Sequence, residues 1–201
     1  MLLSDLELDE EKQQQISHIK EAGEHLLDLI NDIIDLSTLE TGKIKFISES
    51  FILEKLISDC LVLTKLSAEK RGIKISDQVS NRNYGKVYAD YTRLKQVILN
   101  LLSNAVKYNI ENGQVIISCL NQDGYLKIEI SDTGPGLSQE QIERLFVEFE
   151  RAGAEHSNIQ GTGIGLTISR RLIESMNEKI GVTSSPGKGA VFWITVPVAR
   201  S

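Results

Sequence analysis

The chain has 201 residues, of which 41% are hydrophobic and 25% are charged, so it can bury a core and is not a disordered chain. The net charge of -6 argues against a nucleic-acid partner but leaves room for a phosphate ligand, which needs only a local positive site. The two cysteines, Cys60 and Cys119, form no zinc spacing and no disulfide framework. With no secretory signal and no apolar run of ~20 residues, we expect a cytoplasmic chain, with any membrane anchor of the parent protein outside it.

Residues 9–41 predict one long helix that stops at Gly42. Apolar or small residues recur at spacings of three and four, and a second apolar stripe widens the face. The first stripe is Ile16, Ile19, Gly23, Leu26, Ile30, Ile33 and Ser37, and the second is Leu27, Leu29, Ile34 and Leu36. So wide a face needs partners on more than one side, as in a helical bundle. We therefore expect a boundary between segment 1–41 and a domain over 42–201.

After the boundary, helical and strand patterns alternate. Strands are predicted over 43–52, 73–79, 114–120, 125–131, 182–184 and 190–196, and helices over 53–71, 90–109, 138–149 and 162–176. Asp123-Gly124 predicts a hairpin turn, and Ser138 with Gln141 predicts a capping box. The predicted fold is an α/β (α+β) two-layer sandwich, a mixed sheet with helices on one face, preceded by the long helix.

The first chemical block is NLLSNAVKY, residues 100–108. On a helix, Asn100, Asn104 and Lys107 share one face, opposite the leucines. Amide oxygens suit Mg²⁺ and an ammonium suits phosphate, so this face favours a metal–phosphate ligand. The alternative is the ordinary solvated face of an amphipathic helix.

The second block, DTGPG, directly follows a predicted strand. Asp132 at the strand's end could accept a hydrogen bond from an amine such as adenine N6, and Gly134 and Gly136 allow close backbone approach. The alternative is a tight turn held by an Asx hydrogen bond.

The third block, GTGIGL, opens a helix, where backbone N–H groups and the positive helix end can cradle phosphate. Its glycine spacing fits neither the dinucleotide-binding fingerprint nor the P-loop. A purely structural glycine loop is the alternative.

Together, and in this order, the three blocks resemble the N, G1 and G2 boxes of sensor histidine kinases. LFVEFERAG resembles the F box through Phe146 and Phe149, and SSPGKGAVFWITVP resembles the terminal glycine–strand block. Residues 16–44 resemble the second helix of that family's dimerisation hairpin. The resemblance covers nearly the whole chain and implies the Bergerat-type ATP-binding fold of the GHKL superfamily.

The resemblance also implies roles for individual residues. Asn104 would bind Mg²⁺, and Lys107 would contact phosphate. Tyr108 would line the adenine or ribose side, and the base would be bound by Asp132, Gly134 and Gly136. Arg151 would reach the γ-phosphate, and the phosphates would be wrapped by Gly161, Thr162, Gly163, Gly165 and Leu166. Residues 150–160 would form a lid. ATP-hydrolysing cousins carry a glutamate where this chain has Asn100, and an amide is no general base, which favours phosphoryl transfer over hydrolysis.

The resemblance further implies that the intact protein transfers the γ-phosphoryl of ATP to a histidine and then to a response-regulator aspartate. Neither His18, His25 nor His156 lies in an H box, and all three are interpreted as solvated residues. We therefore expect the acceptor on a preceding helix outside this chain, no self-phosphorylation by the chain alone, and a homodimer through the long helix. The alternatives are an ATPase of the same fold, an anti-sigma-type Ser/Thr kinase, and a non-catalytic interaction module.

Overall fold

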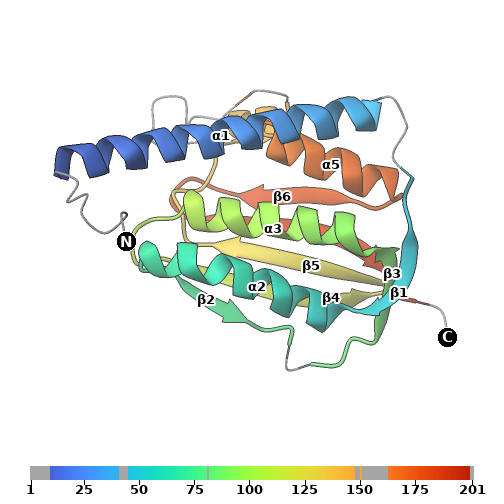
Figure 1. The fold of residues 1–201 in the computed structure, drawn as a ribbon. Helices are drawn as coiled ribbons and strands as arrows, with labels where there is room; N and C mark the ends of the chain where they lie inside the picture. The colour runs from blue at the N-terminus through green and yellow to red at the C-terminus, as the bar shows by residue number, and fades with distance from the viewer. Residues whose placement is uncertain (1–9, 41–44, 81, 148–149, 151–162, 200–201) are drawn as a thin grey trace, which may run out of the picture.

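The computed structural model describes residues 10–40, 45–80, 82–147, 150 and 163–199. A long helix, α1 (Glu10–Glu40), runs along one side of an α/β body (Figure 1). The body contains helices α2 (Leu53–Lys70), α3 (Tyr91–Lys107), α4 (Gln139–Arg144) and α5 (Gly165–Ser175). Its strands are β1 (Ser48–Ile52), β2 (Lys74–Asp77), β3 (Lys86–Asp90), β4 (Gln114–Gln122), β5 (Tyr125–Asp132), β6 (Ile180–Ser184) and β7 (Ala190–Pro197).

Five strands form one mixed sheet in the order β2-β4-β5-β7-β6, with β2 parallel to β4 and the other pairs antiparallel. Strands β1 and β3 form a separate antiparallel ribbon. Helices α2, α3 and α5 cover one face of the sheet (Figure 1). Alternate residues of each central strand point into this layer, as Ile128 and Ile130 do on β5, and are buried. The predicted two-layer α/β sandwich is therefore confirmed.

Helix α3 is the central helix because one whole face of it is apolar. Its buried side chains are Leu94, Val97, Ile98, Leu101, Leu102, Ala105 and Val106. Asp90 caps the helix by accepting a hydrogen bond from the Arg93 amide at 3.0 Å. The polar side chains of residues 100, 104 and 107 are left on the other face, as the sequence predicts.

The local predictions hold where the signal is periodic or chemical. Helix α1 spans the predicted range, and the β4–β5 hairpin turns through Asp123 and Gly124 with φ of 41° and 90°, a two-residue turn of the primed kind. The capping box of Ser138 and Gln141 is present at the start of α4. No helix within the described ranges is long and apolar enough to cross a membrane.

Several predicted ranges were wrong. Residues 45–47 are not strand, so β1 begins at Ser48, and β3 at Lys86–Asp90 was not predicted at all. β2 ends at Asp77 instead of residue 79, and α4 ends at Arg144 instead of residue 149. α5 begins at Gly165 instead of residue 162. β3 was missed because its partner β1 lies far back in the sequence, and pairing over that distance leaves no local pattern.

Candidate nucleotide site

The glycine block at the start of α5 packs on the polar face of α3. The amide Nδ2 of Asn100 donates to Ser169 Oγ at 2.8 Å, and Ser169 Oγ donates to the Gly165 carbonyl at 2.9 Å. A Cβ at Gly165 would stand 2.7 Å from Asn100 Oδ1, closer than real Cβ contacts allow. A side chain at position 165 would therefore force the Asn100 side chain to move, and with it the hydrogen bond that links α3 to α5.

The second block meets the other end of the same helix. A Cβ at Gly134 would lie 2.8 Å from the Tyr108 carbonyl oxygen and 2.7 Å from Asp132 Oδ1. The backbone of the DTGPG loop thus lies directly on the C-terminal end of α3. Asn104 lies on α3 between the two contacts, four residues from both Asn100 and Tyr108, so all three predicted blocks gather along this helix.

Asp132 is the last residue of β5 and is half-buried. Its Oδ1 accepts from the Gly134 amide at 2.8 Å and from the Ala190 amide at 3.3 Å. The first of these is the Asx hydrogen bond of the turn alternative, so that alternative holds for one oxygen. Among the described residues no donor contacts Oδ2, which leaves that oxygen to accept from a ligand.

Burial raises the pKa of Asp132, because desolvation disfavours its charge, and the hydrogen bonds from Gly134 and Ala190 partly offset this. A carboxylate kept partly desolvated in this way forms strong hydrogen bonds with a donor that reaches it.

The glycine turn between β6 and β7 contacts the DTGPG loop and supports it. Gly136 has φ of 71°, and a Cβ there would overlap the Ser185 carbonyl oxygen. The Gly187 amide donates to the Pro135 carbonyl at 2.6 Å, and the Leu137 amide donates to Ser184 Oγ at 2.9 Å. The terminal block thus fixes the conformation of DTGPG.

Three residues that sequence reasoning missed hold the end of α3: Asn109 and Thr133 attach it to the sheet, and Arg71 attaches it to α2. Buried Asn109 donates from Nδ2 to the Gln114 carbonyl at 3.0 Å, and Thr133 Oγ1 donates to Asn109 Oδ1 at 3.1 Å. Arg71, at the end of α2, donates to the carbonyls of Lys107 and Asn109. Apart from Gln114, these partners lie far from the end of α3 in the sequence, so only the polar residue types at a helix end hinted at them.

The cationic and metal-binding candidates lie on the exposed side of α3. The ammonium of Lys107 lies 5.4 Å from the centre of the Tyr108 ring, which is a cation–π distance. Asn104 is half-buried, and within the described ranges its carboxamide forms no hydrogen bond.

The start of α5 has the features of an anion-binding helix end. Gly163 has φ of 73°, and no side chain of the described residues caps the first N–H groups of the helix. Leu166 packs against the core and secures the first turn.

Helix α5 also holds the F-box segment. Thr167 Oγ1 donates to the Phe146 carbonyl at 3.2 Å, and the Arg170 guanidinium lies 5.5 Å from the Phe146 ring centre. The glycine block and the first phenylalanine of the F box are therefore connected through one helix.

Some predicted residues lie outside the described part of the chain, namely Phe149, Arg151, His156, Gly161 and Thr162. His18 is exposed on α1, as its interpretation as a solvated residue requires.

Comparison with known proteins identifies the family. Residues 89–200 match the family described as histidine kinase-, DNA gyrase B-, and HSP90-like ATPase, and the chain belongs to it. ATP is the nucleotide of this family, and the relatives place the chain among the ATP-binding catalytic domains of sensor histidine kinases.

The chain is 36% identical over 205 residues to the sensor histidine kinase GacS of Pseudomonas protegens, covering 100% of the chain and 22% of GacS. It is 37% identical over 188 residues to the non-motile and phage-resistance protein of Caulobacter vibrioides, covering 91% and 22%. It thus spans about a fifth of the length of these relatives.

Solved structures agree with this assignment. Full-length ShkA in complex with AMPPNP superimposes with a TM-score of 0.80 at 31% identity, covering 95% of this chain and 40% of ShkA. The histidine kinase ThkA in complex with the response regulator protein TrrA gives a TM-score of 0.74 at 26% identity, covering 98% and 53%.

Proposed function

We propose that this chain binds Mg·ATP for phosphoryl transfer to a histidine, as the catalytic part of a longer sensor kinase. The observation that carries the proposal is the convergence on α3 of the glycine block, through Gly165, and the Asp132 loop, through Gly134. Phosphoryl transfer needs positioning and charge stabilisation more than covalent chemistry, and such an arrangement supplies both.

In the proposed site, Asp132 Oδ2 accepts a hydrogen bond from the adenine amine, with Gly134 and Gly136 beside the base and Tyr108 on the adenine or ribose side. Lys107 neutralises phosphate charge. The N–H groups from Gly161 to Leu166, Gly163 and Gly165 among them, hold the phosphate oxygens at the positive end of α5. Arg151 reaches the γ-phosphate.

The chain's residues fit Mg²⁺. The Asn104 carboxamide is half-buried and has no hydrogen bond among the described residues, so its hard oxygen is available as a ligand. Mg²⁺ bound by few protein atoms takes its remaining ligands from phosphate oxygens and water, and it would neutralise charge during transfer.

Asn100 belongs to the transfer machinery without being a base. Its amide is hydrogen-bonded to Ser169, so it orients the start of α5 and leaves the reaction dependent on a supplied nucleophile. An ATPase or an anti-sigma-type kinase of the same fold would instead release phosphate without a histidine substrate, or phosphorylate a Ser or Thr.

The partners of the parent protein follow from the same assignment. Residues 1–41 belong to a dimerisation hairpin and 42–201 to the ATP-binding domain. The exposed apolar side chains of α1 pair with the hairpin helix that carries the phosphoacceptor histidine and with a second copy. These side chains are Ile16, Ile19, Leu26, Leu27, Ile30, Ile33 and Ile34. The phosphoryl group is then relayed to a response-regulator receiver domain, as the complex of ThkA with TrrA suggests.

Titration calorimetry with ATP and MgCl₂ tests the nucleotide site. We expect saturable binding by the unaltered chain, and Asn104→Ala to lose the magnesium-dependent part of the affinity while keeping the fold. Absence of binding heat from the unaltered chain would refute the proposal.

Labelled ATP tests the reaction itself. The chain alone should yield no phosphohistidine, and addition of a separate hairpin carrying an H box should yield acid-labile label on that hairpin. Strong labelling of His18 in the chain alone would contradict the assignment of the acceptor.

A further inference from the structure

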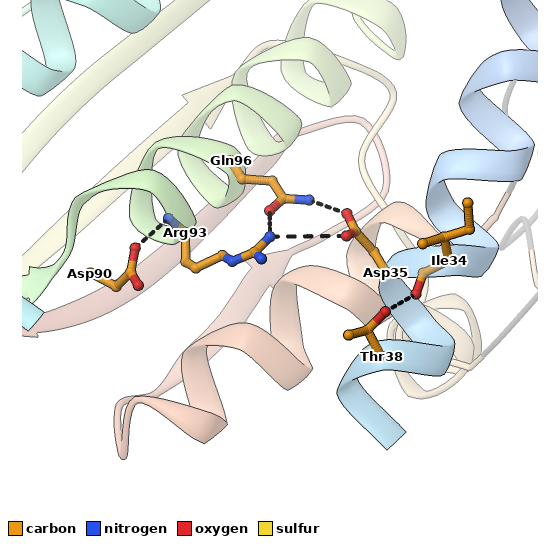
Figure 2. Close-up of polar contacts among 6 residues, drawn as sticks. All are labelled: Ile34, Asp35, Thr38, Asp90, Arg93 and Gln96. Carbon is orange, nitrogen blue, oxygen red and sulfur yellow. Dashed lines mark hydrogen bonds and ion pairs between the residues drawn. The ribbon is translucent and has the colours of Figure 1, made fainter. Parts of the chain in front are cut away.

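Helix α5 carries the N–H groups that are proposed to bind phosphate, and helix α3 is the support on which it rests. The first turn of α3 is capped by Asp90, whose Oδ1 accepts from the Arg93 amide at 3.0 Å (Figure 2). One side of α5 is tied to this support, because Asn100 Nδ2 donates to Ser169 Oγ at 2.8 Å. The direction in which α5 points also depends on what holds its other side.

A phenylalanine that lies between α4 and α5 in the sequence holds that other side. Thr167 Oγ1 donates to the Phe146 carbonyl at 3.2 Å, and Arg170 Cζ lies 5.5 Å from the centre of the Phe146 ring. Thr167 and Arg170 are three residues apart, so they lie on one face of the helix. Both the backbone and the ring of Phe146 are therefore attached to α5.

The two partners in the ring contact are each held in place. Arg170 Nε donates to Glu174 Oε1 at 2.7 Å, one turn farther along α5. Phe146 packs against the core, and its neighbour Leu145 is only 9% exposed. Because the side chains of Arg170 and Glu174 are 51% and 53% exposed, the cation–π contact is a weak one, and its loss changes an affinity by only a few-fold.

We propose that Arg170, together with Thr167, is a positioning residue for the phosphate end of the nucleotide site. By holding α5 to Phe146, the two side chains fix the direction of the N–H groups at the start of that helix. The proposal rests on the proposed function, in which those N–H groups bind the phosphates of ATP.

The adenine end of the proposed site is built independently of this attachment. Asp132 lies at the end of β5, and its Oδ1 accepts from the amides of Gly134 and Ala190, neither of which belongs to α5. Release of α5 from Phe146 should therefore weaken the binding of phosphates and leave the binding of the base unchanged.

Titrations of the 201-residue chain with ATP and with adenosine separate the two ends of the site. Arg170→Ala should weaken ATP binding about two- to fivefold, the effect of losing an exposed cation–π contact, and leave adenosine binding unchanged. Thr167→Val removes the hydroxyl donor and should weaken ATP binding about two- to twelvefold with the same selectivity. Arg170→Lys keeps a cation over the ring and should restore most of the ATP affinity.

Arg170 also carries a charge that attracts phosphate at a distance, and a double-mutant cycle with Phe146→Leu separates that effect from positioning. Phe146→Leu keeps every charge and most of the apolar bulk but removes the ring, so it should weaken ATP binding as Arg170→Ala does. Arg170→Ala should then cause no further loss in the Phe146→Leu chain. Equal losses from Arg170→Ala with and without the ring would refute the proposal, because they would show that charge alone acts.

Amide hydrogen exchange without nucleotide measures the attachment itself. The Ile168 amide closes the first turn of α5 by donating to the Ile164 carbonyl at 2.9 Å. Its exchange should be about two- to fivefold faster in Arg170→Ala and in Phe146→Leu. Arg82→Ala is the matched control, because it removes the same charge from an exposed position before β3, and it should leave this exchange unchanged. Circular dichroism of each variant establishes that the chain is folded.

Two results would overturn the positioning role while the unaltered chain binds ATP. One is an equal loss of ATP and adenosine affinity in Arg170→Ala, which would show a general destabilisation of the site. The other is an unchanged ATP affinity in both Arg170→Ala and Thr167→Val. Failure of the unaltered chain to bind ATP would instead refute the proposed function, and the positioning role with it.

Discussion

Replacing Asp132 by Asn separates the two roles of this side chain, which are to hold the loop through Oδ1 and to accept from the ligand through Oδ2. Asn keeps an oxygen at the Oδ1 position, so the hydrogen bonds from the Gly134 and Ala190 amides at 2.8 and 3.3 Å can be retained. At the Oδ2 position it places an NH₂ group. A ligand amine would then face a donor instead of an acceptor.

The expected loss of affinity follows from the lost bond. A hydrogen bond to a charged group contributes about 1.5–3 kcal/mol, so Asp132→Asn should weaken ATP binding roughly 10- to 150-fold. Guanine presents an oxygen acceptor where adenine presents an amine, so the same variant should narrow the preference of ATP over GTP.

The same variant, Asp132→Asn, should increase the stability of the folded chain although it weakens ATP binding. Because burial raises the pKa of Asp132, the folded state binds the proton more tightly than the unfolded state. The stability from this group is complete below the pKa of the unfolded chain and is lost as pH rises through the folded pKa. At neutral pH the ionised carboxylate therefore costs stability, and Asp132→Asn should raise the unfolding midpoint.

Binding has the reverse pH dependence, because the ionised carboxylate is a much stronger acceptor for the adenine amine than the protonated group. The ATP affinity of the unaltered chain should fall as pH drops through the raised pKa, at a pH above that of an ordinary aspartate. The Asn variant should show no such fall.

Calorimetric titrations with ATP and GTP from pH 4.5 to 8 measure the affinities and their pH dependence. Urea unfolding measures the change in stability. Asp123→Asn, the same change in the exposed β4–β5 turn, is the control and should alter neither affinity nor stability. If Asp132→Asn binds ATP as tightly as the unaltered chain, Asp132 is not the adenine acceptor and the assignment of the site is wrong.

Three further substitutions test the framework of the site. Arg71→Ala leaves two carbonyls at the end of α3 without their donor and should cost about 1–3 kcal/mol in urea unfolding, with a smaller effect on ATP affinity. Gly165→Ala places a Cβ 2.7 Å from Asn100 Oδ1 and should weaken ATP binding in calorimetry; adding Asn100→Ala should restore the thermal midpoint but not the affinity. Gly136→Ala combines φ of 71° with a backbone overlap and should lower stability by more than ~1 kcal/mol in thermal unfolding, whereas an unchanged midpoint would show that the loop can shift.

Much of the fold could be predicted from the sequence because its signals are local. The apolar periodicity of α1 and α3, the Asp123-Gly124 turn and the capping box at Ser138 each reside within one short segment. Strand β3, and with it the ribbon that β3 forms with β1, could not be predicted, because a five-residue strand with mixed burial becomes a strand only through pairing with a distant partner.

The same division applies to the candidate site. The glycine blocks and the polar face of α3 are readable because they combine special residue types at fixed spacing. The roles of Ser169 and Arg71 could not be predicted from the sequence, because a serine or an arginine on a helix carries no special signal. Their roles arise only when folding brings Ser169 beside Asn100 and Arg71 beside the end of α3.

Helix α3 is held by contacts at its first turn, its middle and its last turn. Its first turn is held by Asp90 and by the contact with Asp35, and its middle is held by Ser169. Its last turn is held by Arg71. The residues proposed to contact the nucleotide lie between these attachments, on a helix whose opposite face is buried in the core. A rigid site built in this way gains precision from every attachment, and for the same reason it responds when any one of them is released.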